Sequence, residues 1–199
     1  MDSLPFSQAC ENNKAVILEA IAPRLEAVDG VLEIGSGTGQ HACYFAENLP
    51  GLFWQPTELD ENRGVLQPRL QACGGNNLRP AVSLDVCQRP WPLAIPQAVF
   101  TANTLHIMPL HAVQSLFAYL GDASAAGTLL FVYGPFNYEG RYTSESNASF
   151  DDWLRARDAR SAIRDFEQVD TYARSAGYAL LEDKAMPANN RLVLWQRSV

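Results

Sequence analysis

Three glycines at alternate positions follow a short apolar segment that carries an acid. The segment is VLEI, residues 31–34, and the glycines are Gly35, Gly37 and Gly39. Glycine permits positive φ and lets the backbone approach a ligand closely, while a helix that follows offers its N-terminus to negative charge. Glu33, so close to the loop, would repel a pyrophosphate but suits an ammonium or sulfonium group. The motif predicts a small-molecule site whose ligand carries a positive charge near Glu33.

Two better-known phosphate-binding loops do not fit this motif. The dinucleotide fingerprint G-x-G-x-x-G requires glycine at position 40, where the chain has Gln40, and no Gly-Lys-Ser or Gly-Lys-Thr follows as in a P-loop. What remains is E-x-G-x-G-x-G. A nicotinamide oxidoreductase is therefore a weaker alternative.

Strands and helices alternate along the chain and would position this loop. The expected strands are residues 29–35, 52–59, 81–86, 97–107 and 127–136, with two more in 178–197 joined by a loop at 187–190; the expected helices are residues 12–28, 40–50, 61–73 with an interruption near Pro68, 110–120 and 165–177. This order predicts a parallel sheet, closed by a hairpin that contributes one antiparallel strand near its edge. Ligands of such sheets bind at the carboxyl ends of the strands.

The segment LEIGSGTGQH, residues 32–41, resembles the first motif of the class I methyltransferases that use S-adenosylmethionine (SAM), and the resemblance covers nearly the whole chain. Within that superfamily the chain is most similar to an uncharacterised domain-of-unknown-function branch, on FSQACENNK, TELDENR and GPFNYEGRYTSESNASFDDWLRARD. The resemblance implies a Rossmann-like α/β fold. Its features are a seven-stranded, mostly parallel sheet, helices on both faces and an antiparallel C-terminal strand. It implies no particular substrate.

The resemblance also implies roles for the acid and the glycine loop. Glu33 would hold the amino group of SAM, directly or through water, and the backbone of Gly35, Ser36, Gly37 and Gly39 would enclose its methionine portion. The alternative for Glu33 is a helix or turn partner.

Two further acids, Glu58 and Asp85, stand at the ends of the next two expected strands. The family that the chain resembles has acids at the ends of the same strands. Glu58 would accept hydrogen bonds from both ribose hydroxyls, as the acid of dinucleotide folds does. Asp60 is a rival, although it fits better as a helix N-cap. Asp85 would accept from the adenine amino group while the backbone amide of Val86 contacts the ring; the alternative for Asp85 is a turn.

Candidates for the transfer step lie in TANTLHIMP, at the end of the fourth expected strand. Because the sulfonium already activates the methyl group, the protein chiefly aligns the acceptor, and a base is needed only to deprotonate it. We expect Asn103 beside the cofactor and His106 near the acceptor as a base, with capping or packing as the alternative for His106. His41 and His111 are expected to be helix residues without a catalytic role.

The acceptor pocket is the least determined part of the site. Its candidate walls, which are equally compatible with a core role, are Tyr133, Asn137, Tyr138, Arg141 and Tyr142. The chain has NTLH where enzymes that methylate exocyclic amines of DNA or protein glutamine carry N-P-P-Y or D-P-P-Y. A small molecule is therefore the first choice of acceptor and a protein side chain the second. A sensor or partner subunit that binds SAM without transfer is the alternative to an enzyme.

A long connection at residues 134–164 is predicted to be a functional insertion. Ser149 and Asp152 form a capping box, followed by the apolar residues Phe150, Trp153 and Leu154. We expect a helix at residues 150–158 that acts as a lid over the cofactor, with packing on the far side of the domain as the alternative. The arginines of this region, Arg141, Arg155, Arg157, Arg160 and Arg164, either bind an anionic acceptor or pair with Asp151, Asp158 and Asp165.

Composition sets the broad class. With 199 residues, 47% hydrophobic and 19% charged, the chain is expected to form a single domain, residues 1–199. It lacks a basic start and the run of about 18 apolar residues of a membrane helix, so we expect a soluble cytoplasmic protein. The net charge of -7 makes nucleic acid an unexpected partner. No C-x-x-C metal motif occurs, and the four cysteines are expected to be reduced and mostly buried.

Overall fold

The computed structural model describes residues 4–198, which form two compact units. The first unit ends at Phe100 and the second begins at Thr101. The strands of the main sheet are β1 (Gly30–Ile34), β2 (Phe53–Glu58), β3 (Val82–Ser83), β4 (Ala98–Ala102), β5 (Leu129–Gly134), β8 (Tyr178–Met186) and β9 (Asn190–Arg197). Strand β4 therefore contains residues of both units.

The strand order is β3-β2-β1-β4-β5-β9-β8 in one seven-stranded sheet. Strand β1 pairs in parallel with β2 and β4, β2 pairs in parallel with β3, and β9 is antiparallel to both β5 and β8. The expectation of a mostly parallel Rossmann-like sheet, with one antiparallel strand from a C-terminal hairpin, is confirmed. The hairpin turns at Ala188 and Asn189, both of which have positive φ.

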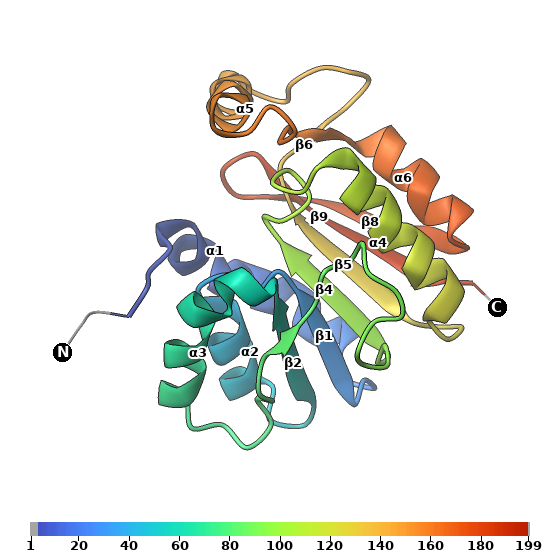
Figure 1. Ribbon diagram of the computed structural model, residues 1–199. Helices are drawn as coiled ribbons and strands as arrows, with labels where there is room; N and C mark the ends of the chain where they lie inside the picture. Colours follow the sequence, from blue (N-terminus) through green and yellow to red (C-terminus); the bar gives the residue numbers. More distant parts are fainter. Residues whose placement is uncertain (1–3, 199) are drawn as a thin grey trace. The chain divides into compact units, whose positions relative to one another are not determined.

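Three helices belong to the first unit: α1 (Gln8–Ile21), α2 (Gln40–Asn48) and α3 (Arg63–Ala72), with short 3₁₀ turns at Ala22–Arg24 and Asp60–Asn62. Helices α2 and α3 lie beside β1 and β2 (Figure 1). Phe45 of α2 packs against Trp54 and Phe100 with ring centroids 5.1 and 5.5 Å apart. The predicted interruption of α3 at Pro68 is wrong, because the helix continues through it and gives up one backbone hydrogen bond.

The second unit contains α4 (Leu110–Ala123), α5 (Glu145–Arg157) and α6 (Phe166–Ser175). Helices α4 and α6 lie side by side against the strands of this unit, whereas α5 lies beyond them (Figure 1). A small two-stranded sheet pairs β6 (Phe136–Asn137) with β7 (Arg164–Asp165) in parallel. This pairing ties the two ends of the expected insertion together.

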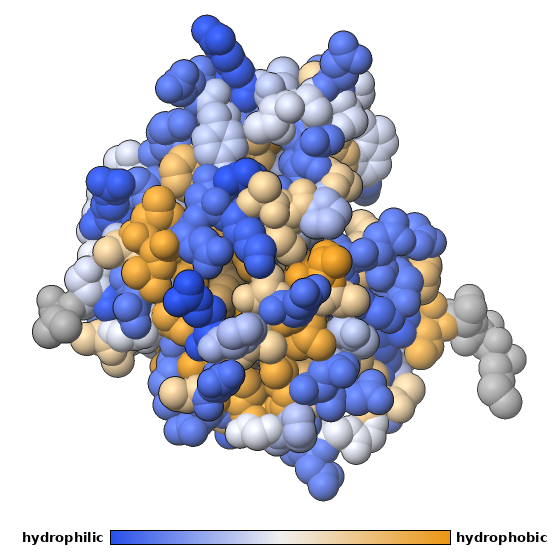
Figure 2. All heavy atoms as spheres, turned by 180° about the vertical axis from the view of Figure 1, so that it is seen from behind, coloured by the Kyte–Doolittle hydropathy of each residue, from blue (hydrophilic) through white to orange (hydrophobic). Residues whose placement is uncertain are grey.

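The helix of the insertion starts earlier than expected. It begins at Glu145, and the hydroxyl of Ser144 accepts a hydrogen bond from the amide of Asn147, so Ser149 lies inside the helix and caps nothing. The insertion presents mainly hydrophilic side chains in the space-filling view (Figure 2). Among the described residues, no helix is both long and apolar enough to cross a membrane.

The expectation of four reduced, mostly buried cysteines is wrong. Cys43 of α2 and Cys73 at the end of α3 form a disulfide, with Cα atoms 5.8 Å apart. These residues are separated by 30 positions, so only the packing of α2 on α3 brings them together. Cys87 is exposed and Cys10 is partly buried. Burial raises the pKa of the Cys10 thiol.

Candidate functional site

The glycine loop connects β1 to α2 and adopts the conformation that its glycines allow. Gly35, Gly37 and Gly39 have φ of 73°, 54° and 76°, a region that other residues rarely adopt. The Ser36 amide donates to the carbonyl of Thr57 at 2.9 Å, and the Thr57 amide donates to Oγ of Ser36 at 3.2 Å. The end of β2 therefore holds the loop in place.

Two of the glycines serve different purposes. A Cβ at Gly39 would lie 2.7 Å from a methyl group of Leu66 in α3, so this glycine allows α3 to pack closely. A Cβ at Gly37 would meet no atom of the described residues within 4 Å. The backbone at Gly37 is thus accessible, as the close approach of a ligand requires.

Glu33 is a buried acid with a defined orientation. Its Oε2 accepts hydrogen bonds from Nε1 of Trp54 and from Oγ of Ser36, each at 2.9 Å. Burial raises the pKa of its carboxyl to about 7, although both hydrogen bonds lower it, and nearby Glu58 raises it further. A carboxyl poised in this way ionises readily beside a cation, which fits the predicted contact with an amino group.

The carboxylate of Glu58 is fixed by backbone amides. Its Oε2 accepts from the Gly37 amide at 2.9 Å and its Oε1 from the Leu59 amide at 2.8 Å, with a long contact of 3.5 Å from Asn62. Each carboxylate oxygen has a second lone pair, so the group can still accept two hydroxyls. Glu58 lies directly against the glycine loop, as the ribose role requires.

The rival acid Asp60 differs from Glu58 in exposure and in contacts. Asp60 begins the 3₁₀ turn but does not cap a helix through its side chain, contrary to the expectation, because Leu59 occupies the N-cap position. The side chain of Asp60 is 80% exposed and forms an ion pair with Arg63 at 3.3 Å. The assignment of the ribose role to Glu58 stays a prediction.

Asp85 adopts the turn that was its alternative role. Its Oδ1 accepts from the Cys87 amide at 2.9 Å and its Oδ2 from the Gln88 side chain at 3.3 Å. The adjacent Val86 is buried. The turn fixes the carboxylate without using all of its lone pairs, so the adenine role stays a prediction.

Gln40 has a role that the sequence did not reveal. Its Oε1 accepts from the Ser7 amide at 2.6 Å and from the Thr38 hydroxyl at 3.0 Å, and its Nε2 donates to Glu11 at 3.1 Å. Gln40 therefore attaches the start of α1 to the glycine loop. The only signal was the departure from the dinucleotide fingerprint, which excludes a ligand but does not predict these partners.

In the second unit, Asn103 and His106 lie near Gly134. A Cβ at Gly134 would lie 3.7 Å from both Oδ1 of Asn103 and Nδ1 of His106. Asn103 has φ of 56°, an uncommon conformation that clusters at functional sites. Burial lowers the pKa of His106 to about 4, and the Arg164 cation lowers it further while Asp151 raises it. The ring is therefore neutral at pH 7, which is the form that accepts a proton.

His41 and His111 lie in helices, as expected. The ring of His41 stacks on Phe45 and contacts Oδ1 of Asn13 at 2.6 Å. Burial lowers its pKa to about 4.

The loop that carries His106 is held by the far end of the insertion. Four successive carbonyls, those of Leu105, His106, Ile107 and Met108, each accept a hydrogen bond from residues 161–164. The Ala162 amide donates to His106 at 3.0 Å and the Ser161 hydroxyl donates to Ile107 at 2.9 Å. The guanidinium of Arg164 donates to the two outer carbonyls.

Asp151 anchors this arrangement from α5, a role beyond the pairing with an arginine that the sequence suggested for it. Its buried carboxylate accepts from the Ile163 amide at 2.6 Å, from Arg155 at 2.7 Å and from the Tyr142 hydroxyl at 2.8 Å. Burial opposes ionisation, but these three donors hold the pKa of Asp151 below its ordinary value. Asn147 and Leu154 share its buried face, a periodicity that was detectable in principle.

The five candidate acceptor residues do not form one wall. Tyr133 and Asn137 are buried, whereas Arg141 and Tyr142 are exposed. The Tyr138 hydroxyl donates to Asp183 at 2.7 Å. Oδ1 of Asn137 is buried and has no hydrogen-bond partner among residues 4–198, so it suits a ligand's donor.

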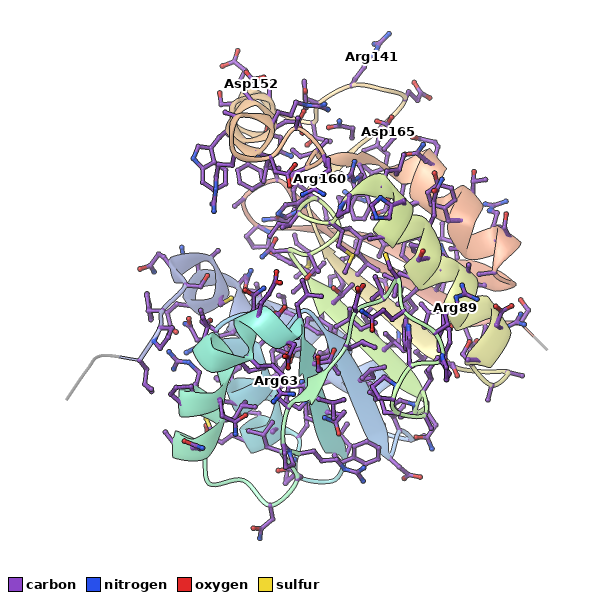
Figure 3. All side chains as sticks on the ribbon, viewed as in Figure 1. Arg63, Arg89, Arg141, Asp152, Arg160 and Asp165 are labelled. Atoms are coloured by element: carbon purple, nitrogen blue, oxygen red, sulfur yellow. A yellow bond between two sulfur atoms is a disulfide. The ribbon has the colours of Figure 1, made fainter. Side chains whose placement is uncertain are left out.

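Some arginines of the insertion pair with aspartates, which was the second of the two roles expected for them. Arg155 pairs with Asp151 at 2.7 Å and Arg160 pairs with Asp158 at 2.8 Å. Arg164 instead is buried and donates to backbone carbonyls. Arg141 and Asp152 point outward from the insertion (Figure 3). The lid role of the insertion stays a prediction.

A family model described as "Protein of unknown function (DUF938)" matches residues 4–197 of the chain. This match confirms the predicted likeness to a domain-of-unknown-function branch. The family description gives no activity.

Solved structures share the fold. The S-adenosylmethionine-dependent methyltransferase SibL in its apo form matches with a TM-score of 0.78 and 21% identity, over 96% of this chain and 56% of that one. Human N-acetylserotonin methyltransferase in complex with SAM matches with a TM-score of 0.77 and 15% identity, over 96% of this chain and 53% of that one. An O-methyltransferase family protein from Burkholderia thailandensis matches with a TM-score of 0.76 and 14% identity, over 94% of this chain and 59% of that one. The chain spans little more than half the length of these proteins, and the likeness establishes the fold.

Proposed function

The chain belongs to the family DUF938, and from its site we propose that it is a SAM-dependent methyltransferase whose acceptor is a small molecule. The observation that carries the proposal is the glycine loop, where Gly37 is accessible and its amide is hydrogen-bonded to Glu58. Solved structures of the same fold, titled as methyltransferases, support it. The predicted cytoplasmic location and the single domain formed by both units are part of this proposal.

The residues of the first unit fit the charges and hydroxyls of SAM. Glu33, buried and oriented by Trp54 and Ser36, would hold the amino group. Glu58 would accept the ribose hydroxyls on the lone pairs that the amides leave, and Asp85 with the Val86 amide would contact adenine. The backbone from Gly35 to Gly39 would pass close to the methionine portion.

The residues of the second unit would act on the acceptor. SAM, when bound, supplies a methyl group on a positively charged sulfur. In the transfer, the acceptor's oxygen or nitrogen would bond to the methyl carbon while the carbon–sulfur bond breaks and leaves its electron pair on sulfur. The neutral imidazole of His106 would take the acceptor's proton, and Oδ1 of Asn137 would accept a hydrogen bond from the acceptor.

The insertion is proposed to form a lid that shapes the acceptor site and excludes water. Its contacts with the carbonyls of residues 105–108 support this role, because they couple the insertion to the loop that carries His106. Limited proteolysis tests the lid. SAM together with an acceptor should protect residues 134–164 from cleavage, and unchanged cleavage would remove the lid from the account.

One experiment separates the enzyme from its alternatives. Calorimetry should show binding of SAM and of its demethylated product, and SAM labelled on the methyl group should transfer label to the dialysable fraction of a cell extract. Label in the retained protein fraction would favour a protein side chain as acceptor. Binding without transfer to either fraction would favour a sensor. Binding of NADH in place of SAM would overturn the proposal in favour of an oxidoreductase.

A further inference from the structure

A stack of rings begins at His106 and continues along α5. The ring of Phe150 packs edge-on against His106, with centroids 5.3 Å apart, and the ring of Trp153 lies nearly parallel to Phe150 at 5.7 Å. The guanidinium carbon of Arg157 lies 4.7 Å from the centroid of the Trp153 ring. These four side chains are called the ring stack below.

The ring stack does not belong to the face by which α5 packs. The buried residues of α5 are Asn147, Asp151 and Leu154. At about 100° per residue, Phe150, Trp153 and Arg157 form a stripe roughly a quarter turn away from that face. Attachment of the helix therefore does not require the two rings.

The exposure of Trp153 is unusual in this chain. Its side chain is 49% exposed, whereas Trp54, Trp91 and Trp195 are between 0% and 5% exposed. Ile107, the neighbour of His106 in sequence, is also 59% exposed. Large apolar surfaces that stay in water beside a polar group are typical of ligand-binding sites.

We infer that Phe150 and Trp153 form an aromatic platform for the methyl acceptor, and that the acceptor is a planar aromatic molecule. This inference rests on the proposed function, because it takes His106 as the residue that faces the acceptor. Because Phe150 and Arg157 already lie against the Trp153 ring, a flat ring would pack across the edges of Phe150 and Trp153 in the edge-to-face manner, while its hydroxyl or amine extends toward the imidazole. Arg157 supplies a positive charge at the outer end, which favours a ring that carries an acidic substituent.

A matched pair of probes tests the requirement for a flat ring. The probes are 4-hydroxybenzoate and trans-4-hydroxycyclohexanecarboxylate, which carry the same substituents and charge but differ in aromaticity. Saturation-transfer NMR should detect the aromatic probe and give a signal at least about fivefold weaker for the saturated one. Neutral 4-hydroxybenzyl alcohol tests the charge and should bind more weakly than 4-hydroxybenzoate.

Substitutions test whether the probe binds at the ring stack. Trp153→Leu keeps an apolar side chain but removes the ring, and should weaken binding of 4-hydroxybenzoate by about fivefold to tenfold. The control is Leu181→Ala, which alters another exposed apolar residue and should leave binding unchanged. Because Trp153 is the exposed tryptophan, 4-hydroxybenzoate should also protect the wild-type fluorescence from quenching by acrylamide.

The outcomes separate this inference from the proposed function. Equal binding of the aromatic and saturated probes, or unchanged binding to Trp153→Leu, would overturn the platform. SAM affinity, measured by calorimetry on the same samples, should be the same in wild type and Trp153→Leu. If wild-type protein binds SAM but no aromatic probe, the inference fails and the proposed function stands. If it binds the aromatic probe but not SAM, the proposed function fails, and the ring stack is then an aromatic-binding site but not one for a methyl acceptor.

Discussion

The two units hold their candidate residues in place by different means. In the first unit, the candidate acids Glu33 and Glu58 belong to two neighbouring parallel strands, and hydrogen bonds between the ends of β1 and β2 hold these strands and the glycine loop together. In the second unit, the loop with His106 depends on residues 161–164, more than fifty positions away in sequence. Contacts between neighbouring strands therefore position the glycine loop, whereas hydrogen bonds from a segment distant in sequence position the loop that carries His106.

This difference has consequences for substitution. In the first unit the candidate side chains are proposed to bind SAM, so their removal should affect binding more than folding. In the second unit the buried carboxylate of Asp151 binds the amide of Ile163, and residues 161–164 in turn donate hydrogen bonds to the loop that carries His106. Removal of this carboxylate should affect folding first.

The largest effect is expected for Asp151→Ala. Removing the carboxylate leaves the buried Ile163 amide without an acceptor and frees Arg155 and the Tyr142 hydroxyl, so the free energy of unfolding should fall by about 3 kcal/mol. Asp158→Ala is the control, since Asp158 pairs with Arg160 at the surface and should cost less than about 1 kcal/mol. Urea denaturation measures both, and equal losses would contradict the anchoring role.

The pH dependence of the Asp151 contribution has a definite sign. Because its pKa is lowered in the folded protein, its stabilisation is present above the unfolded-state pKa and is lost as the pH falls through the folded value. Wild type should therefore lose more stability than Asp151→Asn on acidification below about pH 4. The Asn variant retaining the same acid sensitivity would assign that loss to other carboxyls.

The next effect is expected at Glu33, with the opposite sign. Its pKa is raised to about 7, so its contribution is fully present below the unfolded-state pKa and is lost as the pH rises through 7. The unfolding free energy of wild type should fall between pH 5 and 8 by up to roughly 3 kcal/mol more than that of Glu33→Gln. Thermal or urea unfolding at several pH values measures the difference.

Binding of SAM gives a second test of the raised pKa of Glu33. If its carboxylate pairs with the amino group of SAM, saturating SAM should lower its pKa and binding should release a proton. Calorimetry in buffers of different ionisation enthalpy detects that release. Proton release that persists in Glu33→Gln would assign it to another group.

A smaller effect is expected at Glu58. Truncation to Ala should weaken SAM binding by roughly 1 to 3 kcal/mol, as for a lost hydrogen bond to a charged group. Asp60→Ala is the matched control two positions away, and its affinity should match wild type because its side chain is mainly in water. The reverse pattern would transfer the ribose role to Asp60.

Much of the fold was predictable from the sequence, because strand and helix periodicity and the turn residues act locally. The alternation and the final hairpin predicted a mostly parallel sheet with one antiparallel strand, whereas the order of the strands was not predicted. Errors occurred where tertiary packing decides. Residues 81–86 suggested a full strand but only Val82 and Ser83 pair, and α3 continues through Pro68. Cys43 and Cys73 meet only because α2 and α3 pack together.

The site was predictable to a different degree in the two units. The positive φ of the glycines and the accessible backbone at Gly37 follow directly from residue type and spacing. The roles of Asp151 and Arg164 did not, because both residues stand among other charged residues that are exposed. Their burial depends on partners distant in sequence, which composition and periodicity do not identify.

The most direct test of the account is SAM binding to two matched glycine variants. Gly37→Val and Gly127→Val each introduce a β-branched residue at positive φ, with no described atom within 4 Å of the new Cβ. Both should lose similar stability from the backbone conformation. Calorimetry should show wild-type SAM affinity for Gly127→Val and no detectable binding for Gly37→Val. Unchanged affinity in a folded Gly37→Val protein would show that the glycine loop does not bind SAM.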